Sequence, residues 1–385
     1  CIYREPPFPL LRIGRLRFNM MEKLFLITVL LVLFKLPGFV SPDYVPAIFT
    51  FGDSILDAGN NRFIKNCTAQ ANFPPYGSTY FHHPTGRFTN GRTVADLISQ
   101  YIGIDFQKPY LEAHLDVVNG SIKSYPSNGI NFASAGSGVI PQTNQDEHVL
   151  PLQVQLQQFQ TLVQQGQIDT TLIQNSLFLF ESGSNDIFGY FFAAGSGAFQ
   201  ELPRPHDFVQ AMLDQVESFV DEIYNLGARR IALFSLGPVG CVPARAMLKD
   251  APLDRCYGKL NFMVERYNHG LFKMARLARW KYPNAVIAYG DVYRMVWHFR
   301  AHPYRYGFLD VTNACCGAGQ LGGEMQCGIG PYKVCQNPDE FMFWDLFHPS
   351  EHTYQLISES LWDGDRLQIK PVNLRTLADI DLFNY

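Results

Sequence analysis

Four polar segments of this 385-residue chain contain side chains that could carry out covalent chemistry together. Three of them follow apolar runs, and the fourth places an imidazole three positions after a carboxylate. In order they are Gly52-Asp53-Ser54, Ser134-Ala135-Gly136, Gly183-Ser184-Asn185-Asp186 and Asp345-Leu346-Phe347-His348. Acyl transfer by serine needs a hydroxyl nucleophile, a base, a carboxylate that orients the base and donors for an oxyanion. The four segments contain a candidate for each of these components.

Several of the polar residues also have a simpler structural interpretation. Ser54 follows an apolar run and could cap a helix, since serine is a preferred N-cap residue. His348 could merely lie near a helix N-terminus, with Pro349 suited to the first turn. The short spacing from Asp345 to His348 would nevertheless let the carboxylate fix the imidazole locally. Asp57 and Asp186 are interpreted as turn-forming residues rather than catalytic groups.

The elements that must position these segments alternate between strands and helices. Apolar runs predict strands at 47–51, 129–134, 176–180, 230–236 and 285–289, with a brief strand at 341–345. Helical periodicity indicates helices at 94–102, 152–163, 209–226, 257–282 and 292–299, and a last helix from His348-Pro349 through Trp362. Residues 57–91 and 312–338 are expected to be loops, and the tail 366–385 is ambiguous. This alternation favours a three-layer α/β/α sandwich with a mostly parallel central sheet. Because parallel strands end at one edge, we expect the polar segments to meet there.

Composition limits the classes of function. The chain is 47% hydrophobic and 17% charged and carries a formal net charge of −4. That apolar content is enough for a large core, and we expect residues 42–385 to form one domain. The mild negative charge and the lack of a basic run in this domain argue against a nucleic-acid partner. No cofactor or metal is expected.

The N-terminal region has the pattern of a secretory signal. Residues 1–19 contain four arginines and precede Met20-Met21, a better start, so they are interpreted as an upstream or non-native extension. Residues 20–41 are expected to be a signal peptide, whose apolar stretch 24–34 is too short to span a bilayer comfortably. Cleavage is expected between Gly38 and Tyr44, and an uncleaved signal anchor is the alternative. No later segment is long and apolar enough for a membrane helix.

The cysteines and two sequons fit an oxidising compartment. Six cysteines are expected to form disulfides whose pairing the spacing leaves open: Cys241, Cys256, Cys315, Cys316, Cys327 and Cys335. A zinc cluster is the weaker alternative, since Cys-x-x-Cys spacing is missing. The odd count points to Cys67 as the unpaired thiol. Asn66 and Asn119 begin glycosylation sequons.

Taken together in this order, the motifs resemble the GDSL esterase/lipase family of the SGNH hydrolase superfamily, in its secreted plant branch. The stretches that carry the resemblance are 51–61, 84–92, 131–136, 183–186, 236–241 and 343–349, within a region from Val45 to Trp362. The chain departs from the usual pattern in two places. Ile55 replaces the usual leucine, and Ala135-Gly136-Ser137-Gly138 replaces the commoner Gly-Gly-Ala-Gly.

The resemblance implies a fold and a role for each residue. It implies the flavodoxin-like SGNH hydrolase fold, with Ser54 as nucleophile, His348 as general base and Asp345 orienting that base. It also implies an oxyanion hole made by the Ser54 N–H, the Gly136 N–H and the Asn185 side chain. Phe188, Tyr190, Phe191 and Phe192 could line an acyl pocket, although aromatic residues after a strand are more often core.

We therefore expect a serine hydrolase that cleaves carboxylic esters through an acyl-Ser54 intermediate. Its substrate would be a small-molecule, lipid or polysaccharide ester, and its location the cell wall or apoplast, with the vacuole as an alternative. An acyltransferase that uses the same triad with an alcohol acceptor is a second interpretation. A non-catalytic binding or regulatory protein on the same scaffold is a third.

Overall fold

The computed structural model describes residues 44–196 and 202–382, which belong to one compact unit. The expected extension at 1–19 and the expected signal peptide at 20–41 lie outside the described residues.

A seven-stranded sheet forms the centre of this unit. Its strand order is β11 (Ile369–Lys370), β6 (Val286–Gly290), β5 (Arg230–Phe234), β4 (Leu177–Glu181), β1 (Ile48–Gly52), β3 (Gly129–Asn131) and β2 (Lys108–Pro109). Six strands are parallel, and β11 is antiparallel to β6. The chain adds β3 and β2 on one side of β1 and β4, β5 and β6 on the other. The strand order therefore reverses beside β1, which is where open α/β sheets bind ligands.

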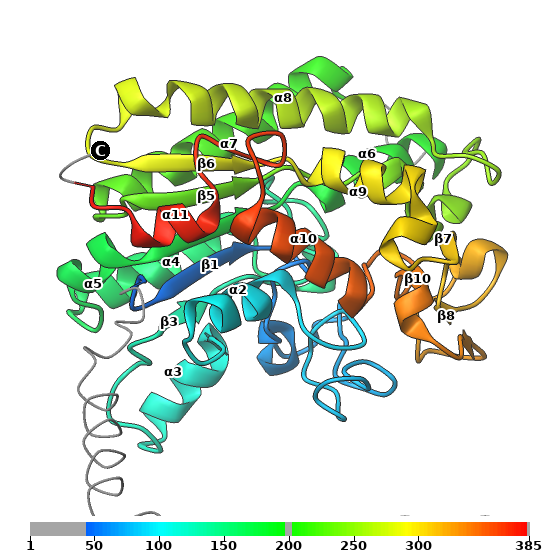
Figure 1. Ribbon diagram of the computed structural model, residues 1–385. Helices are drawn as coiled ribbons and strands as arrows, with labels where there is room; N and C mark the ends of the chain where they lie inside the picture. Colours follow the sequence, from blue (N-terminus) through cyan, green and yellow to red (C-terminus); the bar gives the residue numbers. More distant parts are fainter. Residues whose placement is uncertain (1–43, 197–201, 383–385) are drawn as a thin grey trace, which may run out of the picture. The chain divides into compact units, whose positions relative to one another are not determined.

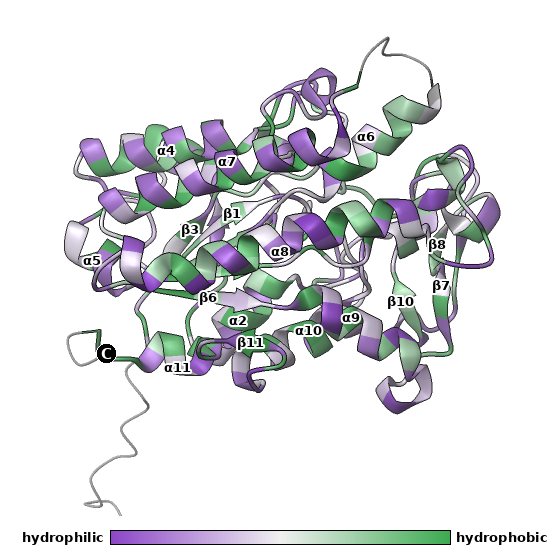
Figure 2. Ribbon diagram, turned by 90° about the horizontal axis from the view of Figure 1, so that it is seen from above, coloured by the Kyte–Doolittle hydropathy of each residue, from purple (hydrophilic) through white to green (hydrophobic). Residues whose placement is uncertain are grey.

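Helices cover both faces of the sheet (Figures 1 and 2). One face carries α4 (Leu152–Gln164), α7 (Pro205–Asn225) and α8 (Gly258–Lys281), with α7 packed against both of the others. The other carries α2 (Val94–Ile102), α10 (Glu351–Asp363) and α11 (Leu374–Asp379), with α10 in the middle. The predicted three-layer sandwich with a mostly parallel sheet is confirmed.

The remaining elements are short or flank the sandwich. Four further helices are α3 (Tyr110–Val118), α5 (Thr170–Asn175), α6 (Ser184–Ser196) and α9 (Val292–Ala301). Four short strands lie outside the main sheet: β7 (Asp310–Ala314), β8 (Cys316–Gly317), β9 (Lys333–Val334) and β10 (Phe341–Phe343). Single 3-10 turns are η1 (Asn60–Phe63), η2 (Gln145–Glu147), η3 (Val239–Cys241), η4 (Pro243–Met247), η5 (Pro303–Tyr306), η6 (Gln320–Gly322) and η7 (Pro338–Glu340).

The core explains why β1 can be apolar on both faces. All five of its residues are buried, as expected for a parallel strand with helices on each side. The ring of Phe51 stacks on Phe132 at 5.0 Å and meets Phe159 and Phe219, from α4 and α7, edge to face. Burying each such side chain contributes roughly 1.5–3 kcal/mol, so the strand that leads to Ser54 is rigidly held.

Several sequence-based predictions of elements were wrong. The last predicted helix does not begin at His348-Pro349: α10 begins at Glu351, and the Ser350 side chain caps it by accepting the Thr353 N–H. His348 instead lies in a loop next to the isolated bridge between Phe343 and Pro349. Segment 312–338 contains β8 and β9 rather than loop alone. The tail 366–385, for which the sequence was ambiguous, contains β11 and α11. The elements β2, α3, α5 and α6 were not predicted, because their apolar patterns are short or weakly periodic.

Candidate active site

The hydroxyl of Ser54 and the imidazole of His348 meet at the carboxyl edge of the sheet. Ser54 Oγ lies 2.8 Å from His348 Nε2, although 294 residues separate them. Both residues are 7% exposed, so the contact is shielded but reachable. Ser54 follows β1 by two residues, and His348 is in the loop between β10 and α10.

The carboxylate of Asp345 lies on the opposite side of the imidazole. His348 Nδ1 is 2.7 Å from Asp345 Oδ1 and 2.9 Å from Oδ2. Oδ1 also accepts the backbone N–H groups of Phe347 and His348, and Oδ2 accepts the hydroxyl of Tyr76 at 2.7 Å. Burial alone would raise the pKa of Asp345, but the charge of His348 and these hydrogen bonds hold it below its usual value. Asp345 is therefore an ionised acceptor that fixes the Nδ1–H tautomer.

Close packing of two strands fixes the turn that presents Ser54. Gly52 has φ +145°, and a Cβ there would lie 1.9 Å from the carbonyl oxygen of Glu181 on β4. Only glycine fits such an approach. One residue later, the Asp53 N–H donates to that same carbonyl, and the Asp53 side chain accepts the Ile55 N–H. The strand ending and the turn thus hold Ser54 at the edge of the sheet.

The three predicted oxyanion donors differ from one another in their hydrogen-bond partners and in whether they line the cavity beside Ser54. Within the described part of the chain, the backbone N–H groups of Ser54 and Gly136 have no hydrogen-bond acceptor. Asn185, in the first turn of α6, directs Nδ2 to the carbonyl of Ser137 at 2.9 Å and lies 3.4 Å from Asp53 Oδ2. Ser54 and Asn185 line the same cavity, whereas Gly136 is not among its lining residues.

Asp57 and Asp186 hold loops, as interpreted from the sequence. Asp57 accepts the N–H groups of Gly59, Asn60 and Ala135, which fastens the loop after β1 to the loop after β3. Asp186 accepts the N–H groups of two successive residues, 139 and 140. Burial raises the pKa of Asp57 to about 6, against the lowering effect of its hydrogen bonds.

Sequence reasoning missed two polar residues near the site, Tyr76 and Glu181. Glu181 ends β4 with 4% exposure and faces Asp53 within hydrogen-bonding reach, so two carboxyl groups are buried side by side. Desolvation raises the pKa of Asp53 to about 6, and desolvation and the charge of Asp53 raise that of Glu181 well above its usual value. A glutamate at the end of the otherwise apolar run Leu177–Phe180 was the available signal.

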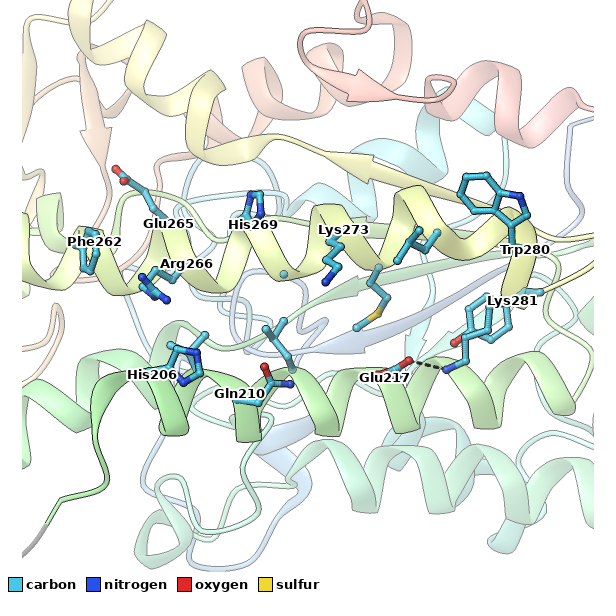
Figure 3. A pocket seen from close by; sticks show the side chains of 16 residues that line it. His206, Gln210, Glu217, Phe262, Glu265, Arg266, His269, Lys273, Trp280 and Lys281 are labelled. Carbon is cyan, nitrogen blue, oxygen red and sulfur yellow. Dashed lines mark hydrogen bonds and ion pairs between the residues drawn. The ribbon is translucent and has the colours of Figure 1, made fainter.

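A cavity of about 90 Å³ opens beside Ser54, Asn185 and His348. A larger groove of about 1070 Å³ lies on the surface between α7 and α8 (Figure 3). Its lining includes His206, His269 and the ion-paired Glu217 and Lys281, but no serine, threonine or cysteine. Ser54, by contrast, lines the smaller cavity together with His348. Four aromatic residues were considered as candidates for an acyl pocket. Phe188 lines the cavity beside Ser54, whereas Tyr190, Phe191 and Phe192 do not.

Three disulfides stabilise loops around this edge of the sheet. They are Cys241–Cys256, Cys315–Cys335 and Cys316–Cys327, so all six expected cysteines are paired. Cys67 is the unpaired cysteine among the described residues, and its buried thiol donates to the carbonyl of Ala69. Over the same residues, no group of three or more His, Cys, Asp or Glu side chains is arranged to hold a metal ion.

The α/β/α sandwich and a Ser-His-Asp arrangement at its sheet edge define the class of serine-hydrolase-like α/β proteins. The chain belongs to the GDSL-like lipase/acylhydrolase family, whose sequence model matches residues 48–361. This confirms the resemblance seen in the sequence and makes the protein a carboxylic ester hydrolase by family.

Its similarity to plant proteins extends over nearly the whole chain. It is 58% identical over 338 residues to GDSL esterase/lipase 6 of Arabidopsis thaliana, covering 88% of this chain and 92% of that protein. GDSL esterase/lipase 5 of the same plant is 32% identical, with coverage of 87% and 88%. A GDSL lipase of Tanacetum cinerariifolium is 31% identical, with coverage of 92% and 94%.

Proposed function

We propose that this protein is a secreted hydrolase that cleaves carboxylic esters through an acyl intermediate on Ser54. The observation that carries the proposal is the 2.8 Å contact between Ser54 Oγ and His348 Nε2, with Asp345 bound to the other ring nitrogen. This is the hydrogen-bond chain that general-base activation of a serine requires.

In the first half-reaction, Ser54 Oγ attacks the ester carbonyl carbon and its proton passes to His348 Nε2. The carbonyl oxygen becomes an oxyanion, which the N–H groups of Ser54 and Gly136 and the Asn185 amide would bind. A donor of this kind typically contributes about 3–4 kcal/mol to lowering the barrier. His348 then returns the proton to the alcohol oxygen as the C–O bond breaks, leaving an ester on Ser54.

In the second half-reaction, His348 takes a proton from water, which attacks the acyl carbon. Collapse of the second tetrahedral intermediate releases the carboxylic acid and returns the proton to Ser54. Asp345 stays ionised throughout and stabilises the imidazolium, because its low pKa keeps it from accepting that proton.

The decisive experiment is Ser54→Ala with hydrolysis of short p-nitrophenyl esters and labelling by a fluorophosphonate probe. We expect the folded variant to lose both hydrolysis and labelling, whereas Ser218→Ala, which alters an exposed serine on α7, keeps both. Wild-type-like hydrolysis by Ser54→Ala would refute the mechanism. Products formed with added alcohols decide the acceptor: transfer to an alcohol in preference to water would replace hydrolysis by acyl transfer.

Secretion is part of the proposal. Three disulfides support an oxidising compartment. None of the helices in residues 44–196 and 202–382 is long and apolar enough to cross a membrane. N-terminal sequencing of the protein from its native tissue should find a start between residues 39 and 44. A mature protein that retains 24–34 would contradict cleavage.

We also propose that Asn66 and Asn119 carry N-linked glycans in this compartment. Both side chains are exposed, Asn66 in a loop and Asn119 at the end of α3. Enzymatic removal of N-glycans should lower the mass in two steps, and Asn66→Gln and Asn119→Gln should each remove one step. An unchanged mass would contradict glycosylation.

A further inference from the structure

The cavity beside Ser54 continues along the edge of the sheet, away from the reacting groups. At one end it is bounded by Ser54, Asn185 and His348, which lie beside β1 and β4. Its wall also includes Phe234 and Leu361, which approach each other over Gly290 at the end of β6. The sheet order β1-β4-β5-β6 separates these ends by three strand spacings, roughly 14 Å.

The two ends differ in chemistry. The carboxyl groups of Asp53 and Glu181 and the imidazole of His348 gather at the β1–β4 end. The other end is lined by valines of α9, Val292 and Val296, and by Ile357 and Leu361 on successive turns of α10. Two hydroxyls in the cavity wall are exceptions: that of Ser235 accepts the Tyr293 N–H, and that of Tyr354 on α10 is buried without a hydrogen-bond partner among the described residues. The far end therefore offers an entering group apolar surface and hardly any hydrogen bonds.

The size of the cavity limits what can enter. The cavity volume is about 90 Å³. One water needs about 10–15 Å³ of such volume, so the cavity has room for roughly six to nine waters. Because this volume extends over roughly 14 Å along the edge of the sheet, the cavity is narrow for its length, and α9 and α10, which contact each other, both contribute to its wall. An unbranched hydrocarbon chain matches this shape, whereas a sugar ring would lose its hydrogen bonds to water without gaining new ones.

From this geometry we infer that the cavity binds the acyl group of the ester and selects unbranched aliphatic acyl chains of medium length. The inference rests on the proposed function, since it requires the acyl carbon at Ser54. The chain would run from Ser54 under α10 toward Val296 and Leu361, and the alcohol portion would remain outside. Displacing water from apolar walls provides the driving force.

Two substitutions at Val296 test the inference in opposite directions. With p-nitrophenyl acetate, octanoate and dodecanoate, wild type should prefer octanoate. Val296→Phe fills the cavity and should lower the ratio of kcat/KM for octanoate to that for acetate about ten- to a hundred-fold. The size of the effect is expected because one extra or missing methylene group in an apolar pocket already changes kcat/KM by a similar factor. Val296→Ala enlarges it and should raise relative activity on dodecanoate several-fold.

The controls separate this inference from the proposed function. His298→Phe adds the same ring on the exposed face of α9 and should leave the chain-length profile unchanged. If Val296→Phe fails to fold, Val292→Phe, at the half-buried start of α9, tests the same wall. Unchanged profiles in folded variants that still hydrolyse acetate would overturn the acyl site but leave the Ser54 mechanism intact. The acyl site would also be overturned if these variants changed the preference among esters that share one acyl group and differ in the alcohol.

Discussion

Tyr76 donates a hydrogen bond of 2.7 Å to Oδ2 of Asp345, across 269 residues of sequence. Tyr76 is buried, and its own hydroxyl accepts Gln326 Nε2 at 3.2 Å. The loop after β1 and the disulfide-linked segment before β10 thus meet behind the carboxylate. The Tyr76 hydroxyl gives Oδ2 a hydrogen-bond donor in addition to His348, and this restricts rotation of the carboxylate. Because the carboxylate binds the imidazole, the orientation of His348 is restricted as well.

Tyr76→Phe should therefore slow the reaction without weakening substrate binding. A hydrogen bond to a charged group is worth about 1.5–3 kcal/mol, so kcat should fall about ten- to a hundred-fold while KM stays nearly constant. Steady-state kinetics and the rate of fluorophosphonate labelling measure this. The matched control is Tyr190→Phe, which removes a hydroxyl bonded to the Pro203 carbonyl and should leave kcat unchanged. Equal effects of the two substitutions would argue against a positioning role for Tyr76.

The Cys316–Cys327 disulfide should act on the same hydrogen-bond chain, because Gln326 precedes Cys327. Replacing both cysteines by serine should cost about 2–4 kcal/mol of unfolding free energy, measured by urea denaturation. It should also reduce kcat, and combining it with Tyr76→Phe should give less than the product of the separate reductions, as expected for coupled residues. Independent, multiplicative losses would show that the disulfide does not act through Gln326 and Tyr76.

The buried ion pair Arg87–Asp96 should matter far more than an exposed pair. Asp96 accepts two hydrogen bonds of 2.7 Å from Arg87 and also caps α2 through Thr93. Asp96→Asn leaves the Arg87 charge buried without its partner and should cost about 3–5 kcal/mol of unfolding free energy. The control is Asp207→Asn, which breaks an exposed pair with Arg204 and should change the unfolding free energy far less, because water screens exposed charges. Similar losses for the two variants would contradict this ranking.

The buried pair of Asp53 and Glu181 should make stability depend on pH. Burial raises the folded-state pKa of Asp53 to about 6, so the folded state binds the proton more tightly than the unfolded chain does. This contribution is fully present below about pH 4 and is lost as the pH rises through about 6.

Glu181→Gln should weaken that dependence, since the amide can donate to Asp53 without titrating. Relative to wild type, the variant should gain on the order of 1–3 kcal/mol of unfolding free energy between pH 4.5 and pH 7. Urea denaturation at the two pH values measures the difference. The control Glu222→Gln alters an exposed carboxylate on α7 and should leave the pH dependence as in wild type. Parallel curves for Glu181→Gln and wild type would refute the role of the pair.

Much of the sheet could be predicted because its strands are unmistakable in sequence. The runs ending at Phe51, Phe180 and Phe234 are apolar at nearly every position, as burial on both faces requires. The elements that were missed, such as β2, α3 and α11, are short or amphipathic only in part. These elements form because of contacts with residues that are distant in the sequence. The periodicity of a short segment carries little information about such contacts.

The sequence by itself determined the alternating α/β order, the candidate residues Ser54, Asp345 and His348, and the family to which they point. Only the tertiary structure decided which groups meet: the contact of Ser54 with His348, the hydrogen bond from Tyr76 to Asp345, the pairing of the cysteines and the carboxyl pair of Asp53 and Glu181. Residue types and spacing report local conformation, whereas contacts between residues hundreds of positions apart depend on strand order and on the packing of loops at one edge of the sheet.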